Sequence, residues 1–404
     1  MADDELYRSL QRHLDRMPVP YPATESGVEL RILRQLFTPE EARLALCLSA
    51  ILEPATTIHR RVRGAMTREQ MCEALDRMAE RGSIRKAGGK KGARYGKSPL
   101  VIGIYEAQVN RLTPELERDV RAYFDEGYGA ALQGVHPPQT RIVPVTKSIP
   151  VEHAIARYDD LRSFVETTPG PFAAIPCICR QGRELTGQSC RVTKEAHNCL
   201  MFGKVAAMMT EKGIARSVSK EEMLGLLEQA DREGLVLEPQ NTQEPMFVCC
   251  CCGCCCGVLT TAKKWPRPAD FFQTDFVAQV DGERCSLCGV CATRCQMDAI
   301  VADSEPVKVA EERCIGCGLC VCWTAEGVYL SAHGSKVHGY PSVVLPRCGP
   351  APMAKLTSAM CMPTSTSCSP QPSLASCLIH RCFVENSKRC SPPLTLPTTS
   401  AWKS

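Results

Sequence analysis

The stretch from Cys285 to Cys322 constrains the chain more than any other part of it. It opens with C-x2-C-x2-C-x3-C, and a second run, Cys-Ile-Gly-Cys-Gly-Leu-Cys, follows. The two runs contain Cys285, Cys288, Cys291, Cys295, Cys314, Cys317 and Cys320. A cubane iron–sulfur cluster takes one thiolate per iron, and a tight loop can supply three at this spacing. Zinc, the alternative, typically takes its four cysteines from two separated C-x2-C pairs, so the doubled run favours 4Fe–4S clusters.

The second run lacks a fourth cysteine at the expected place. In two-cluster proteins the fourth cysteine of each run binds the other cluster, so Cys295 completes the site of the second run. The matching ligand of the first run is expected at position 324, which is a threonine, and the nearest thiol is Cys322. The sequence therefore supports one complete cluster and a second cluster whose fourth ligand, Cys322, is left open.

Length and composition narrow the class of protein. The chain has 404 residues, enough for two or three domains, and a net charge of +4, which does not by itself require a nucleic-acid partner. No apolar run reaches membrane-spanning length, and the N-terminus MADDELYRSLQRHL lacks the apolar segment of a signal peptide. The 27 cysteines of such a chain are expected to be thiolate metal ligands in a reducing cytoplasm.

The first third of the chain predicts a small helical domain. Residues 1–37 are expected to form an amphipathic lead-in, and residues 38–110 a winged-helix-like domain. Helix starts are marked by capping boxes at Thr38 and Thr67, with another helix over 56–62 between them.

A β-hairpin is expected next, with strands over 83–86 and 100–105 around a Gly/Lys-rich tip. Three helices and a hairpin are the winged-helix order. One interpretation is DNA binding, with the basic residues of the hairpin on phosphate: Lys86, Lys90, Lys91, Arg94 and Lys97. The other is a packing or docking module with a solvated basic hairpin. We favour packing, because the third helix mixes arginines with acids and has no strongly basic face.

Residues 111–270 are expected to form a mixed helical, cysteine-rich middle domain. Helices are predicted over 113–131 and 158–166, and another begins at the capping residue Ser219.

Ten cysteines of this middle domain are candidate metal ligands. They are Cys177, Cys179, Cys190, Cys199, Cys249, Cys251, Cys252, Cys254, Cys255 and Cys256. Isolated core cysteines are usually inert. For the cysteines between positions 249 and 256, the alternative is a low-complexity sequence without a ligand role. Neighbouring cysteines of that run diverge along the chain, so they cannot all serve one four-ligand site. A structural metal or a third cluster remain the open alternatives, because the spacing matches no standard run.

The composition changes after Val321. The remaining sequence is rich in Ser, Thr and Pro, and its cysteines, such as Cys348 and Cys361, keep no ligand spacing. We expect disorder there, and assign 275–330 to a ferredoxin-type domain and 331–404 to a disordered tail.

From about residue 35 to 321 the chain resembles a family of cytoplasmic 4Fe–4S proteins of anaerobic bacteria and archaea. The resemblance rests on LFTPEEARLAL, IYEAQVNRLTPE, KSIPVEH, PCICRQ, CCGCCCGVL and the two cysteine runs. It implies an N-terminal winged-helix-like segment, a C-terminal dicluster ferredoxin domain and electron transfer. In that family the second run continues to a Cys-Pro, which this sequence lacks. A shifted reading frame near codon 321 would explain both this loss and the change of composition.

The sequence therefore predicts an α+β protein ending in a bacterial-type dicluster ferredoxin domain. The favoured function is single-electron transfer through 4Fe–4S clusters to or from a redox protein partner. A redox-sensing winged-helix transcription regulator is the second hypothesis. An enzyme with its metal among the middle cysteines is the third, although no acid–base pair in the sequence supports it.

Overall fold

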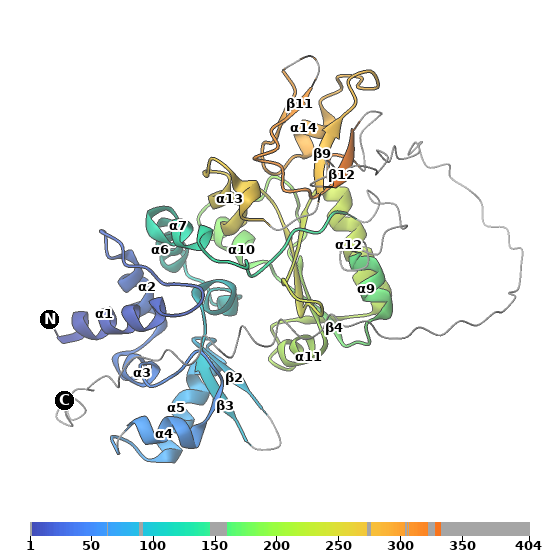
Figure 1. Cartoon of the computed structure of the whole chain (residues 1–404). Helices are drawn as coiled ribbons and strands as arrows, with labels where there is room; N and C mark the ends of the chain where they lie inside the picture. The colour runs from blue at the N-terminus through green and yellow to red at the C-terminus, as the bar shows by residue number, and fades with distance from the viewer. Residues whose placement is uncertain are drawn as a thin grey trace, which may run out of the picture. The chain divides into compact units, whose positions relative to one another are not determined.

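The structure is a computed structural model (Figure 1) that describes residues 2–62, 64–88, 92–145, 160–272, 276–303, 305, 307–321 and 328–332. It is of the α+β class, with helices and sheets mixed. The described residues all belong to one compact unit. The tail predicted to be disordered lies outside the described residues, apart from its first two positions.

The lead-in forms two helices, α1 (Ala2–Asp15) and α2 (Val28–Leu36). Leu10 and Ile32 are fully buried, and Glu29, also fully buried, is held by Arg8 at 2.9 Å. One hydrophobic core continues from these helices as far as Leu319. The predicted domain limits stay predictions, but the lead-in packs as part of a larger core.

The next segment contains the three predicted helices, α3 (Pro39–Ala45), α4 (Ala55–Val62) and α5 (Arg68–Glu80). Both capping boxes are present, as predicted from Thr38 and Thr67.

A three-stranded sheet follows these helices. Its strand order is β1 (Glu53–Pro54), β3 (Arg94–Lys97), β2 (Ile84–Ala87). The predicted return strand over 100–105 is wrong: Leu100–Ile104 form an irregular wide turn, and the hairpin closes on β3. The glycine at position 96 suggested a loop tip, yet it lets the strand approach the carbonyl oxygens of Ser49 and Ile51.

The helices predicted in the middle of the chain are confirmed. Residues 113–131 give α6 (Pro114–Tyr123), a wide turn over Phe124–Tyr128 and α7 (Gly129–Gln133). The other two are α9 (Leu161–Thr167) and α12 (Lys220–Glu233), which begins after Ser219 as expected.

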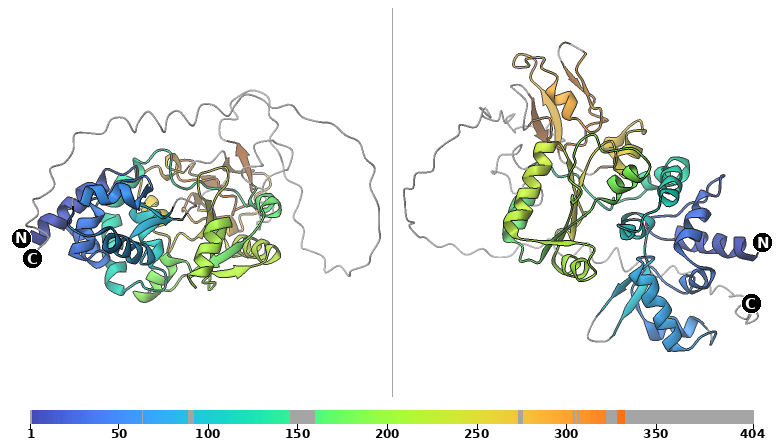
Figure 2. Two further views of the ribbon diagram at one scale, coloured as in Figure 1. Left: turned by 90° about the horizontal axis from the view of Figure 1, so that it is seen from below. Right: turned by 180° about the vertical axis from the view of Figure 1, so that it is seen from behind.

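A description of this middle part as mainly helical is incomplete, because a five-stranded antiparallel sheet organises it. Its strands, in spatial order, are β6 (Arg216–Val218), β4 (Phe172–Ile175), β5 (Cys199–Phe202), β8 (Phe247–Cys251) and β7 (Val236–Pro239). Helices α9 and α12 lie along one side of the sheet and α10 (Ile178–Leu185) along the other (Figures 1 and 2). Two short helices, α11 (Gly203–Glu211) and α13 (Gly257–Ala262), follow β5 and β8.

The C-terminal cysteine runs lie among short strands. Strand β9 (Phe276–Val280) pairs with β12 (Val328–Ala332), and β10 (Ile300–Val301) pairs with β11 (Lys308–Val309). Helix α14 (Val290–Arg294) follows the first run. The expectation of disorder directly after Val321 is wrong for β12, because the open edge of β9 provides it with a backbone partner. Among the described residues, every helix is too short or too polar to cross a lipid bilayer.

Replacing each of two glycines with alanine should change the free energy of unfolding in opposite directions. Gly225 is an exposed position of α12 with no atom near an added Cβ, whereas a Cβ at Gly253 would lie 2.2 Å from the carbonyl oxygen of Gln296. We expect Gly225→Ala to raise the free energy of unfolding by about 0.5–1 kcal/mol, through helix propensity. Gly253→Ala should lower it by about 1–3 kcal/mol, through overpacking. Denaturant unfolding of both variants checks this, and equal effects would contradict the packing described.

Candidate metal centres

The two C-terminal cysteine runs share one backbone design. In each run the second and fourth residues after the first cysteine have left-handed backbone: Leu287 (φ 55°) and Gly289 (φ 71°), then Gly316 (φ 64°) and Gly318 (φ 72°). Glycine adopts this conformation without strain, whereas leucine does so rarely. The two loops therefore have left-handed turns at the same two places relative to their cysteines.

Cys295 and the three cysteines of the second run line one cavity. Their predicted role as ligands of one cluster stays a prediction. The empty space of the cavity is about 370 Å³, open solvent included, and its other walls include Ala278, Ile315 and Leu330. Two backbone N–H groups donate to the sulfurs, Ala278 to Cys314 at 3.4 Å and Ala299 to Cys295 at 3.2 Å. Burial raises the pKa of Cys314, Cys317 and Cys320. Such dry thiols ionise only beside a positive charge, which a metal provides.

The first run is more open. Cys291 is buried, and the charges of Cys288 and Cys285 act on it, which places the three cysteines near one another. Cys288 is exposed. Cys322, the candidate fourth ligand, lies outside the described residues, so its role stays a prediction.

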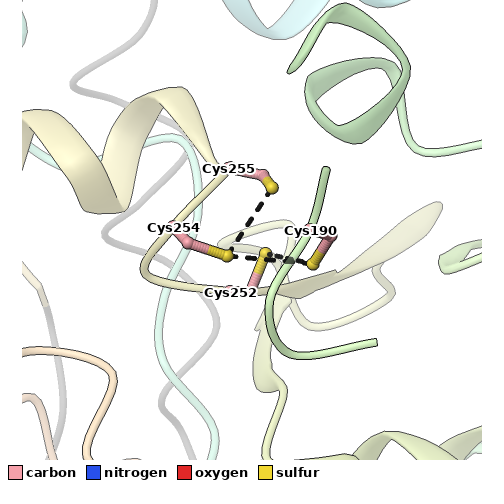
Figure 3. A group of neighbouring side chains, drawn as sticks. All are labelled: Cys190, Cys252, Cys254 and Cys255. Carbon is pink, nitrogen blue, oxygen red and sulfur yellow. Dashed lines mark hydrogen bonds between the residues drawn. The ribbon is translucent and has the colours of Figure 1, made fainter. Parts of the chain in front are cut away.

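The ten middle cysteines separate into two groups. The tetrathiol group consists of Cys190, Cys252, Cys254 and Cys255, whose sulfurs all lie within 4.8 Å of one another (Figure 3). Cys190 comes from the loop between α10 and β5, and the others from the turn between β8 and α13. The remaining six cysteines line a separate enclosed space, called here the thiol chamber.

Strand register explains the thiol chamber. Cys199 of β5 lies directly opposite Cys249 of β8, which lies opposite Glu238 of β7. Directly opposed residues share one face of a sheet, and Cys251 shares that face by the two-residue alternation of β8. Cys250 therefore points to the other face; it is buried, and burial raises its pKa to about 12.

Helix starts complete the chamber. Cys177 follows β4, Cys179 lies in the first turn of α10, and Cys256 precedes α13. The six thiols act on one another in the order Cys177, Cys179, Cys256, Cys251, Cys249, Cys199. The neighbouring thiol of Cys177 lowers the pKa of Cys179 well below its usual range, and that of Cys199 does the same for Cys249. The close packing of the six thus favours the thiolate form at these two positions.

Two arginines lie near these thiols. Arg180, which is buried, donates from Nη2 to the carbonyl of Cys250 at 2.7 Å, and among the described residues its Nε and Nη1 have no hydrogen-bond partner. Burial lowers its pKa, but the charges of Cys177 and Cys252 raise it above its ordinary value. Arg121, which is half-buried, bonds Glu117 at 2.7 Å, and its Nη1 has no partner in the described part of the chain. A guanidinium that has lost water needs an anionic neighbour, which Glu117 provides for Arg121 and thiolates would provide for Arg180.

The six cysteines of the thiol chamber belong to one cavity that extends beyond them. Its empty space is about 760 Å³, open solvent included, and apolar side chains such as Val101, Val120 and Phe124 form much of the rest of its wall. Two carboxyl groups also line it: burial raises the pKa of both Glu106 and Glu238 to about 8.

Sequence reasoning missed these carboxyls and Arg121. Cross-strand pairing selects Glu238, and no local pattern marks it. Arg180, in contrast, directly follows the C-x-C pair, and this position marks it from the sequence as a polar neighbour of the candidate ligands.

The basic hairpin offers fewer phosphate contacts than its sequence suggested. Lys97 is 6% exposed and donates to the carbonyl of His13 at 2.8 Å. Lys86 pairs with Asp76 at 2.7 Å. Lys90 and Lys91 lie outside the described residues. The burial of Lys97 removes one of the five expected DNA contacts.

Comparison of the chain with family models, with curated proteins and with solved structures gives no match.

If the thiol chamber binds a metal, substitution of a chamber cysteine should lower the metal content, whereas substitution of a nearby cysteine outside it should not. Cys177→Ser should lower the metal bound per chain and destabilise the fold, because metal-binding energy is folding energy. Cys250→Ser is the matched control: it changes a buried thiol of the same sheet that lies outside both ligand groups. Metal analysis and thermal unfolding of both variants provide the measurement. Unchanged metal content in Cys177→Ser would exclude a metal in the chamber.

Proposed function

We propose that this chain is an iron–sulfur electron-transfer protein that passes single electrons to or from a redox protein partner. The observation that carries the proposal is the shared, mostly apolar cavity of Cys295, Cys314, Cys317 and Cys320. These four cysteines come from both runs in the interleaved combination that two-cluster ferredoxins use.

The residues around this cavity fit a 4Fe–4S cluster. Unlike the sulfurs of the tetrathiol group, which lie within 4.8 Å of one another, these four cysteines line an open space. A cubane needs such a space, because each thiolate binds a different iron. When bound, the cluster would supply one-electron redox chemistry.

The surrounding residues would set how that chemistry operates. Ala278, Ile315 and Leu330 give the cavity an apolar wall, which would lower the polarity around a bound cluster. The N–H groups of Ala278 and Ala299, which donate to two of the sulfurs, stabilise negative charge there and so tune the reduction potential.

A second cluster on Cys285, Cys288, Cys291 and a fourth ligand, with Cys322 the candidate, is part of the proposal. The exposure of Cys288 suits this site to exchange with a partner protein. A cytoplasmic location is proposed on the same chemistry, since a reducing compartment keeps the thiols free for metals. Membership of the anaerobe 4Fe–4S family, with an N-terminal winged-helix-like segment, fits these features and belongs to the proposal.

The broken second run gives the direct test. Cys314→Ser should abolish the cluster completed by Cys295 and leave the signal of the other, measured by electron paramagnetic resonance with iron and acid-labile sulfide counts. Cys322→Ala should destroy or convert the other cluster if Cys322 replaces the residue at 324. It should change nothing if the reading frame has shifted. Two intact cubanes in Cys314→Ser would refute the ligand assignment.

The hairpin makes a separate prediction about DNA. With Lys97 buried and Lys86 paired, the purified chain should bind DNA weakly, and the binding should fall steeply with salt, as phosphate contacts do. Footprinting at physiological salt tests this. A sequence-specific footprint would favour the redox-sensing regulator instead.

A further inference from the structure

The tetrathiol group differs in kind from the cavity proposed for the cluster. Its sulfurs are in direct contact: Cys190 lies 3.6 Å from Cys252 and 3.8 Å from Cys254, and Cys254 lies 3.6 Å from Cys255 (Figure 3). Four thiolates at about 2.3 Å from one zinc ion, at the corners of a tetrahedron, stand about 3.8 Å apart. The observed distances therefore fit one ion at the centre and leave no room for a cubane.

The backbone around these sulfurs is also arranged for thiolates. The N–H groups of Val192 and Thr193 lie near enough to the sulfur of Cys190 to favour negative charge on it, and the N–H of Arg191 does the same for Cys254. Arg180, with two unpartnered N–H groups, carries a positive charge close to Cys190 and Cys252. A divalent ion with four thiolates keeps a net charge of −2, which these donors and this guanidinium stabilise.

We propose that Cys190, Cys252, Cys254 and Cys255 bind a single tetrahedral ion of the class that thiolates select, Zn²⁺ or Fe²⁺. This site is separate from both clusters of the proposed function and from the thiol chamber. The ion joins the loop over residues 186–198 to the turn between β8 and α13.

The position of that turn indicates a structural role for the ion. The N–H of Gly253 donates to Oε1 of Gln296 at 2.7 Å, and Gln296 directly follows Cys295. Cys256 of the thiol chamber ends the same turn. An ion in the tetrathiol group therefore holds in place a segment that contacts the proposed cluster ligands on one side and the chamber on the other.

The test uses the full chain purified without oxygen. Zinc, iron and acid-labile sulfide are counted in the native chain, in Cys190→Ser and in the control Cys250→Ser. We expect Cys190→Ser to lose about one ion per chain with no loss of labile sulfide, and Cys250→Ser to lose none. Zinc and iron are both supporting identities for the lost ion. Equal metal content in all three, or a loss of labile sulfide in step with iron, would overturn the proposal.

Cobalt binding and a conservative variant distinguish the loss of the ion from misfolding of the variant. With Co²⁺ bound in place of the ion, the native chain should show the intense visible bands and sulfur-to-cobalt charge transfer of a tetrahedral tetrathiolate. Cys190→His keeps a ligand atom and should retain the ion with shifted bands. Cys190→Ser should lose the bands and speed tryptic cleavage at Arg191 and Lys194 in the loop. Cobalt bands unaffected by Cys190→Ser would count against the site.

The result is independent of the proposed function. A chain without any acid-labile sulfide, but with one ion removed by Cys190→Ser, would refute the electron-transfer proposal and leave this site standing. A chain with full clusters but without that ion would refute this site and leave the electron-transfer proposal standing.

Discussion

The burial of sulfur charge is the constraint on which this structure depends. A thiolate loses its hydration inside a protein, and a guanidinium does too, so each is costly there unless the other balances it. Arg180 is 7% exposed, and among the described residues the charges that raise its pKa are those of cysteines from both middle groups. The sheet, the two helix starts and the loop of Cys190 all converge on this guanidinium. The cysteine-rich middle is therefore built around a charge balance as much as around an apolar core.

The same constraint distinguishes the three groups of thiols. The C-terminal cavity has almost no polar wall, and its sulfurs receive single backbone donors. The tetrathiol group has its sulfurs in contact and its donors in one short loop. The thiol chamber has six sulfurs, two carboxyl groups and an adjoining apolar cavity. Different spacing of the same side chain thus prepares three different chemical environments within one fold.

Local features of this molecule were predictable from its sequence, and features made by distant segments were not. Capping boxes and cysteine spacing act within a few residues, so the starts of α3 and α5 followed from them, and so did the grouping of Cys295 with the second run, with which it lines one cavity. The five-stranded sheet was missed because its strands are three to five residues long and carry cysteine and alanine where branched side chains are usual. Without that sheet, neither the division of the middle cysteines nor Glu238 could be found. Strand β12 was missed because its order comes from its partner β9.

The close approach of Gly253 to Gln296 bears on how such a protein can evolve. Other hydrogen bonds link the C-terminal segment to the middle of the chain: the N–H of Val145 donates to the carbonyl of Cys317 at 3.1 Å, and the guanidinium of Arg294 donates to the carbonyl of Asp231 at 2.7 Å. A C-terminal segment taken from another protein would have to reproduce these contacts together with the close approach at Gly253, which has no space for a methyl group. The C-terminal segment and the cysteine-rich middle are therefore expected to be inherited together, so that recombination at their junction would be counter-selected.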